Sequence, residues 1–127
     1  MLANAPIAPT IPVTDLAKAR EFYEGKLGLN VKQEDEGEGL LLEAGKGSML
    51  YLYKRPPAPS QHTLASFHVQ DIDAEMDELI AKGVEFEHYD MPGLKTDEKG
   101  IAVMGTMRGS WFKDPDGNIL ALDEERK

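Results

Sequence analysis

The chain has 127 residues, 41% of them apolar, a formal charge of -9 and no cysteine. This length and apolar content suit one folded domain over residues 1–127. The acidic balance argues against nucleic acid or an anionic membrane surface as a partner, because both select basic patches, and the absence of cysteine excludes a disulfide, a thiolate metal site and a cysteine nucleophile.

A strand and a helix open the chain. The strand over residues 6–13 holds Pro9 and Pro12, which is typical of an edge strand or of one with a bulge. Asp15 follows in the N-cap position, apolar residues then recur at helical spacing, and Gly28 stands where a left-handed C-terminal cap is common. The start of the chain lacks the basic and apolar regions of a signal peptide, and the acidic composition fits a soluble cytoplasmic protein.

Three short strands follow the helix and complete a βαβββ module over residues 6–53. They are separated by glycine-containing turns and span residues 29–33, 40–43 and 49–53. Three prolines then fall within residues 54–62, a density that no regular helix or ladder tolerates. This segment is therefore predicted to link two modules.

The second half, residues 63–123, repeats the pattern of the first. A strand over residues 64–69 leads to Asp71, which lies 56 residues after Asp15, and the next amphipathic helix ends at Gly83, which lies 55 residues after Gly28. A further strand begins over residues 84–88. Residues 89–100 form a long loop without a counterpart in the first half, either a lid or a solvated insertion. The repeat predicts a duplicated unit.

The strongest local signal is the run Asp114-Pro-Asp-Gly-Asn118. Proline pre-sets the second position of a turn, and glycine accepts the positive φ that follows. The run predicts a hairpin turn between a strand that ends at Phe112 and a strand that begins at Ile119.

In this order, the features resemble the vicinal oxygen chelate superfamily. The resemblance rests on the two modules, on Phe22-Tyr23 ahead of Leu27-Gly28-Leu29, and on the run from Trp111 to Asn118. The superfamily includes glyoxalase I (lactoylglutathione lyase), methylmalonyl-CoA epimerase, extradiol dioxygenases, fosfomycin-modifying enzymes and bleomycin-binding resistance proteins. The resemblance implies an α+β fold in which two βαβββ modules curl around a cup, and it implies a homodimer.

The resemblance also places the metal ligands of the family, on the first and last strand of each module. The matching positions in this chain are Ala8, Tyr51, Leu64 and Ala121. Alanine and leucine offer no donor atom, and a neutral tyrosine is a poor ligand. We therefore expect no metal and no other cofactor, and the Lewis-acid chemistry of the family is not carried over.

Side chains alternate along a strand, so residues two apart from a ligand position share its face. Trp111 falls on the cup side because its neighbour Phe112 is expected to pack beneath the helix, and an aromatic residue in the matching place contacts ligand in the fosfomycin-modifying relatives. An aromatic wall with a few polar groups is typical of a site for a flat, partly apolar molecule. The expected lining is Thr10, Met49, Tyr51, Tyr53, Leu64, Ser66, His68, Trp111 and Asp123.

Each of these assignments has an alternative. Trp111 and the two tyrosines can instead fill the groove or a dimer contact. His68 is the histidine expected on the cup side, either as a general base or as a solvated or locally paired residue, and it forms an unusual metal site only if Asp123 or Glu43 joins it. The planar guanidinium of Arg108 suits an anionic ligand, although the sequence does not decide on which face of the sheet Arg108 lies.

The sequence thus predicts a metal-free member of the superfamily that binds a small, partly aromatic molecule. One alternative is an enzyme of the lyase, isomerase or dioxygenase type that uses His68. A further alternative is a protein-interaction module. The same fold hosts catalysis and sequestration, so fold alone does not choose among them.

Overall fold

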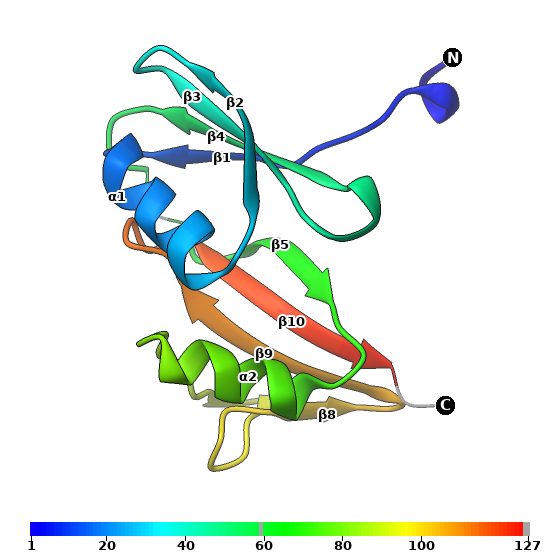
Figure 1. Ribbon diagram of the computed structural model, residues 1–127. Coiled ribbons are helices and arrows are strands. Elements are labelled where there is room, and N and C mark those ends of the chain that lie inside the picture. The colour runs from blue at the N-terminus through cyan, green and yellow to red at the C-terminus, as the bar shows by residue number, and fades with distance from the viewer. Residues whose placement is uncertain (59, 126–127) are drawn as a thin grey trace. The chain divides into compact units, whose positions relative to one another are not determined.

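The computed structural model describes residues 1–58 and 60–125, which group into two compact units divided after Ala58. The first unit follows a short 3-10 turn at Leu2–Asn4 and holds β1 (Thr10–Val13), α1 (Leu16–Arg20), β2 (Asn30–Asp35), β3 (Gly39–Glu43) and β4 (Met49–Lys54). The second unit holds β5 (Thr63–His68), α2 (Ile72–Ala81), β6 (Asp90–Met91), β7 (Leu94–Lys95), β8 (Ala102–Met104), β9 (Met107–Lys113) and β10 (Ile119–Glu125) (Figure 1).

Both units have the same strand order, which confirms the duplicated α+β architecture. The first sheet is ordered β1-β4-β3-β2 and the second β5-β10-β9-β8. In each sheet the first strand of the module runs parallel to the last strand, and the remaining pairs are antiparallel. The proline-containing β1 lies at an edge of its sheet, as predicted, but it begins at Thr10 and leaves residues 6–9 outside the strand.

Both helical segments begin and end where the sequence predicts, when the π-helical residues Glu21–Lys26 that continue α1 are included. Asp15 accepts hydrogen bonds from the backbone N–H groups of Ala17 and Lys18, and Asp71 accepts one from Ala74. Gly28 and Gly83 have φ values of +79° and +92°, the left-handed conformation that glycine adopts without a steric cost. These caps position the helices relative to the strands that precede and follow them.

The first helix differs from the single α-helix that its spacing predicts. After Arg20 it widens into a π-helical segment, Glu21–Lys26, in which the N–H of Leu27 donates to the carbonyl of Phe22 at 3.0 Å. A π turn carries more residues than an α turn, and here the adjacent Phe22 and Tyr23 are both buried, with their rings edge to face at 5.4 Å.

Each helix packs on one face of the sheet in its own unit. In the first unit the buried leucines of β3 and β4 alternate with half-exposed residues, and Ile11 and Val13 of β1 join the buried set. In the second unit Phe112 is fully buried on β9, in edge-to-face contact with Phe86. Burying such apolar side chains is the main favourable contribution to folding. The face of each sheet that its own helix leaves uncovered is called the helix-free face.

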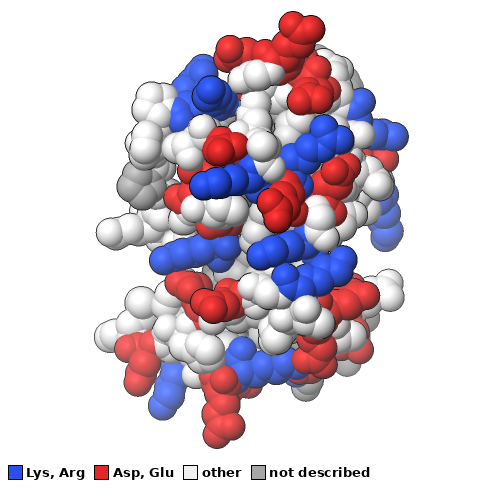
Figure 2. Space-filling model, turned by 60° about the vertical axis from the view of Figure 1, so that its left-hand side comes forward, with Lys and Arg blue, Asp and Glu red and all other residues white. Residues whose placement is uncertain are grey.

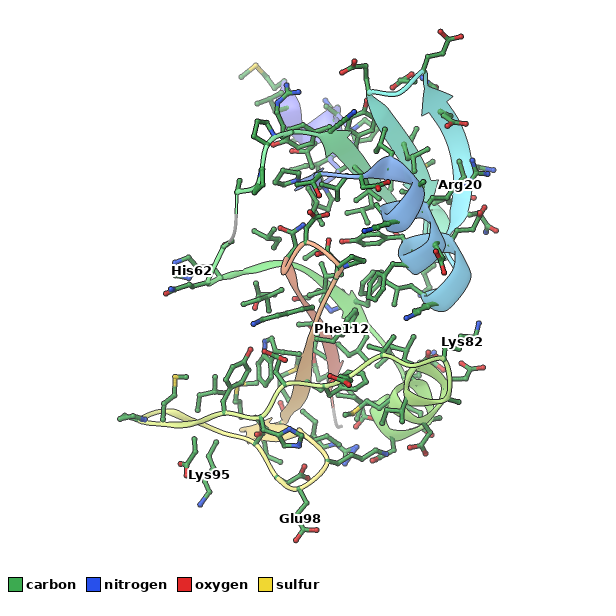
Figure 3. All side chains as sticks on the ribbon, turned by 90° about the vertical axis from the view of Figure 1, so that its left-hand side faces the viewer. Arg20, His62, Lys82, Lys95, Glu98 and Phe112 are labelled. Carbon is green, nitrogen blue, oxygen red and sulfur yellow. The ribbon has the colours of Figure 1, made fainter. Side chains whose placement is uncertain are left out.

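Two expectations for the second unit are wrong. Residues 84–88 do not form a regular strand, because only Phe86 makes a bridge, to Phe112. Residues 89–100 are not a featureless loop: they contain the hairpin β6–β7 with Pro92-Gly93 at its tip. Hydrogen bonds between Tyr89 and Thr96 close the base of the hairpin. Lys95 and Glu98 point outward from this insertion (Figure 3).

The predicted turn between β9 and β10 is confirmed. The Asp114 carboxylate accepts hydrogen bonds from the backbone N–H groups of Asp116 and Asn118 and from the Asn118 side-chain amide, at 2.8–2.9 Å. Gly117 takes a φ of +82°. The turn fixes the register in which Trp111 lies opposite Ala121.

Candidate functional site

The predicted site residues of the first unit lie on the helix-free face of its sheet. Thr10 of β1 and Leu41 of β3 both pair with Tyr51 of β4, so the three side chains share that face. Tyr53 and Met49 lie two residues to either side of Tyr51. The strand period of two therefore placed this group on one face.

Tyr51 extends across the sheet to a carboxylate that the sequence analysis missed. Its hydroxyl donates to Asp35 Oδ2 at 2.8 Å, and Gln33 Nε2 donates to Asp35 Oδ1 at 2.8 Å. The ring passes over Gly39, where an added Cβ would lie 2.1 Å from the Tyr51 hydroxyl oxygen. Only glycine leaves room for this ring, so Gly39 belongs to the site as much as Tyr51 does.

The hydrogen bonds shift the ionisation of both groups. The hydrogen bond to Asp35 raises the pKa of Tyr51 above its ordinary value of 10.0. Hydrogen bonds from Gln33 and then Tyr51 lower the pKa of Asp35 below 3.8. Tyr51 is therefore a neutral hydrogen-bond donor at neutral pH.

Tyr53 and Met49 have different surroundings on the same face. The Arg55 guanidinium lies 5.0 Å from the centre of the Tyr53 ring, within the range of a cation–π contact. Met49 pairs with Glu43, whose carboxylate makes an ion pair with Lys32 at 3.4 Å. The ion pair with Lys32 therefore holds the Glu43 carboxylate within the first unit.

The predicted residues of the second unit also share the helix-free face of their sheet. Ala121 of β10 pairs with Ser66 of β5 on one side and with Trp111 of β9 on the other. One step along, Asp123 pairs with His68 and with Gly109. Leu64 lies two residues before Ser66 on the same strand.

Trp111 lies along its own strand toward Gly109. A Cβ added at Gly109 would lie 3.4 Å from Trp111 Cη2 and 3.2 Å from Met104 Cε. The Tyr89 ring packs edge to face against the indole with centroids 5.7 Å apart. Tyr89 was missed from sequence because it belongs to the insertion at 89–100, and no local pattern links it to Trp111.

His68 has a partner that its sequence context did not identify. Its Nδ1 lies 2.5 Å from Asp123 Oδ1, and the side chain is 84% exposed whereas that of Asp123 is 21% exposed. A carboxylate that accepts from Nδ1–H fixes the orientation of an imidazole and leaves Nε2 toward solvent. In this pair the Asp123 carboxylate orients the His68 imidazole, an arrangement that suits a general base.

Arg108 lies on the other face of the same sheet. It pairs with Glu124 across β9 and β10, and it makes ion pairs with Asp73 at 2.5 Å and with Glu124 at 3.4 Å. Glu124 also accepts a hydrogen bond from the N–H of Ile72 at the start of α2. Arg108 therefore links β9, β10 and α2 and does not join the other predicted site residues.

The metal positions of the family hold no ligand set here. Ala8 lies before β1, the Tyr51 hydroxyl donates a hydrogen bond to Asp35, and the side chains of Leu64 and Ala121 carry no metal-ligand atom. Over residues 1–58 and 60–125 no three His, Cys, Asp or Glu side chains are grouped so as to hold a metal ion. The residues present do not fit the metal that the fold family implies.

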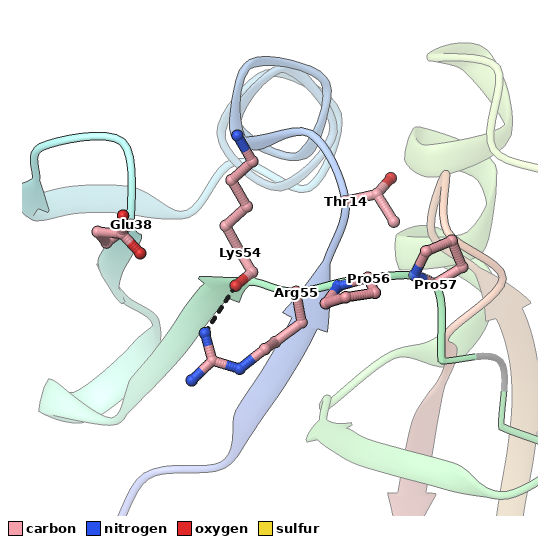
Figure 4. Close-up of a pocket in the computed structure, with 6 residues that line it drawn as sticks. All are labelled: Thr14, Glu38, Lys54, Arg55, Pro56 and Pro57. Atoms are coloured by element: carbon pink, nitrogen blue, oxygen red, sulfur yellow. Dashed lines mark hydrogen bonds between the residues drawn. The ribbon is translucent and has the colours of Figure 1, made fainter.

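A shallow pocket lies at the end of β4 in the first unit, lined by Thr14, Glu38, Lys54, Arg55, Pro56 and Pro57 (Figure 4). The Arg55 guanidinium donates to the backbone carbonyl of Lys54 at 2.9 Å. Figure 4 shows the cationic ends of Lys54 and Arg55 turned away from each other. The two charges do not converge on one point, so the pocket is not a ready-made anion site.

Acidic and basic side chains are interspersed over the face of the molecule that Figure 2 shows. Among the described residues, no helix has the length and apolar character needed to cross a membrane.

Comparison with known proteins supports the architecture. The chain is 28% identical over 124 residues to the uncharacterised protein YraH of Bacillus subtilis (strain 168), covering 87% of this chain and 90% of that one. Its structure is similar to that of TnmS3, an antibiotic-binding protein from Streptomyces sp. CB03234, with a TM-score of 0.75, 24% identity and 98% coverage of both chains.

A superfamily member from Sphaerobacter thermophilus DSM 20745 has a TM-score of 0.73 and 24% identity, and the match covers 98% of this chain and 100% of that one. At this identity the two structural likenesses show the fold alone. The sequence profile of one family matches residues 6–122. The chain belongs to the Glyoxalase/Bleomycin resistance protein/Dioxygenase superfamily.

Proposed function

We propose that this protein binds a small, planar, partly aromatic molecule without a metal ion. The observation that carries the proposal is the Trp111 indole, which lies over Gly109 and is backed by Tyr89. An aromatic ring held in place by its neighbours loses little conformational freedom on binding, and such rings form the walls of many ligand sites. TnmS3, whose fold is similar, is an antibiotic-binding protein, which is consistent with this class of function.

The test is a thermal-shift screen of small aromatic compounds. We expect at least one compound to raise the melting temperature of the protein, and Trp111→Ala to abolish that rise relative to its own unliganded baseline. Trp111 is the only tryptophan of the chain, so its fluorescence reports the same event. Met91→Ala is the matched control, because Met91 is an exposed apolar residue on the β6–β7 hairpin. A broad panel without any stabilising compound would refute the proposal.

A second candidate function is catalysis with His68 as the general base. The hydrogen bond that His68 Nδ1–H donates to Asp123 favours it, since an imidazole oriented by a carboxylate is a common device for proton transfer. The test is turnover of glyoxal adducts, catechols and fosfomycin. Activity that His68→Ala removes would establish an enzyme, and inactivity with all three substrate classes would count against it.

The proposal includes a homodimer in the cytoplasm. The edge strand β8 exposes Val103 and Met104, and exposed apolar edges are often covered by another chain. Light scattering on the purified protein would give the mass of a dimer, and a strictly monomeric mass at high concentration would exclude this part of the proposal.

A further inference from the structure

The row of residues around Asp123 brings a hydrogen-bonded imidazole–carboxylate pair and an aromatic ring onto one face of the second sheet. Asp123 of β10 pairs with His68 on one side and with Gly109 on the other. The Trp111 indole lies over Gly109, so imidazole, carboxylate and indole follow one another across β5, β10 and β9. Adjacent strands are about 4.8 Å apart, which sets His68 about 10 Å from the strand that carries the indole.

The neighbouring row of the same face is made of small side chains. Ser66 and Ala121 pair with each other, and Ala121 pairs with Trp111. Asp123 lies between His68 and the indole in their own row, and the side chains of Ser66 and Ala121 in the neighbouring row are no larger than a hydroxymethyl group. A bicyclic planar molecule that contacts the indole has the length to present a substituent to the exposed imidazole.

Asp123 determines what His68 offers to such a substituent. With Nδ1–H donated to the carboxylate, Nε2 of the neutral imidazole is an acceptor and takes a hydrogen bond from an acidic hydroxyl group. If the proton crosses from that hydroxyl to Nε2, the products are an imidazolium and a phenolate, held by a charge-assisted hydrogen bond. Both arrangements contain the same atoms and protons, and both require a hydroxyl on the ligand.

We infer that the ligand class is the hydroxy-aromatic compounds, bound with the ring against Trp111 and the hydroxyl on Nε2 of His68. The inference rests on the proposed binding function and adds to it the chemical group that is recognised. His68 acts as the acceptor, and Asp123 is a positioning residue that holds the acceptor nitrogen outward. The methyl ether of the same compound has no proton to donate and loses this interaction.

The experiment compares 6-hydroxyquinoline with 6-methoxyquinoline by calorimetric titration of the full chain. One net hydrogen bond corresponds to about tenfold in affinity, so we expect the hydroxy compound to bind about tenfold more tightly. His68→Phe keeps a ring of similar size but no acceptor, and we expect it to equalise the two affinities. His62→Phe changes another exposed histidine, outside the sheet, and is the matched control.

Asp123→Asn tests whether Asp123 orients the His68 imidazole or only stabilises the fold. The asparagine amide donates to Nδ1, which moves the imidazole proton to Nε2 and turns the acceptor into a donor. The preference for the hydroxy compound then falls while the unfolding midpoint changes little.

Each of the other outcomes of these titrations would contradict a specific part of the inference. If both compounds bind equally to the wild-type protein and Trp111→Ala loses both, the hydroxyl inference is wrong and the binding function stands. If the preference survives His68→Phe, another residue receives the hydroxyl and the assignment to His68 is wrong. If neither compound binds while another aromatic compound of the thermal-shift screen does, the hydroxyl inference is wrong and the binding function stands; if the whole screen is also negative, both are refuted.

Discussion

At the scale of single residues, two glycines decide how the aromatic side chains lie. Gly39 and Gly109 occupy matching places in the two modules, each paired with the residue two positions after the last-strand positions Tyr51 and Ala121. Tyr51 crosses one glycine from the neighbouring strand, and Trp111 covers the other from its own strand. In both modules, therefore, the lack of a Cβ at this glycine leaves room for an aromatic ring. The ring comes from the neighbouring strand in the first module and from the same strand in the second.

Gly39→Ala tests this arrangement. The added Cβ would meet the Tyr51 hydroxyl oxygen at 2.1 Å and Cζ at 2.5 Å, so the ring must leave Asp35. Overpacking of this kind costs about 1–3 kcal/mol, which urea unfolding would measure as a lower free energy of unfolding. Most of the cost should vanish in a Tyr51→Ala background, because the next contact of the added Cβ is the Leu52 carbonyl oxygen at 3.0 Å.

The control for this substitution is Gly25→Ala. An added Cβ at Gly25 meets nothing within 4 Å, and its φ is not positive. Gly25 lies in the helical segment Glu21–Lys26, where alanine is favoured over glycine, so we expect Gly25→Ala to cost nothing and to raise the free energy of unfolding by up to about 1 kcal/mol. Equal costs at the two glycines, or an undiminished cost of Gly39→Ala without Tyr51, would contradict the proposed role of Gly39.

At the scale of elements, caps and turns connect sequence to site geometry. Asp15 and Asp71 start the helices, and the Asp114 turn joins β9 to β10. The register set by that turn pairs Trp111 with Ala121 and Gly109 with Asp123. A local signal of five residues therefore aligns groups that lie far from it on the helix-free face.

Asp114→Ala is expected to be the most damaging change in the turn. It removes the acceptor for three hydrogen bonds and leaves the donors of Asn118, which is 1% exposed, without that partner. Unsatisfied buried donors cost about 1–3 kcal/mol, so the free energy of unfolding in denaturant should fall by about that amount. Asp114→Asn keeps one acceptor oxygen and should cost less; a fully neutral Asp114→Ala would show that the turn does not depend on this carboxylate.

At the scale of the whole molecule, one topology carries two different helix-free faces. The first unit presents Tyr51 bonded to Asp35, and the second presents Trp111 beside the His68–Asp123 pair. Duplication preserves strand order and helix position, because these depend on the buried faces. The helix-free faces do not pack against the helix of their own unit, and they carry different side chains.

The metal content of the whole chain tests the empty ligand positions. Ala8, Leu64 and Ala121 provide no donor atoms, so elemental analysis of untagged protein purified without chelator should find far less than one transition-metal ion per chain. Added Zn²⁺ or Mn²⁺ should give no saturable rise in melting temperature, since only an ion that binds the folded state stabilises it. One bound equivalent would overturn the assignment of these positions and favour the enzyme alternative.

The sequence alone determined the features that depend on neighbours a few residues apart. The Asp15 and Asp71 caps, the glycines that end both helices and the Asp114 turn were all predicted, because each uses hydrogen bonds within one or two turns of chain. The face shared by Thr10, Tyr51 and Tyr53 was predicted too, since strand side chains alternate strictly. The family resemblance arose from the order of these local signals.

Only the tertiary structure decided which side chains meet. His68 and Asp123 are 55 residues apart and Tyr51 and Asp35 are 16 apart, and both pairs depend on strand register and side-chain direction. Tyr89 reaches Trp111 from an insertion whose hairpin the sequence did not predict, and Arg108 faces α2 instead of the site. Local periodicity gives the face of a residue but not its partner, because the partner is chosen by pairing between distant strands.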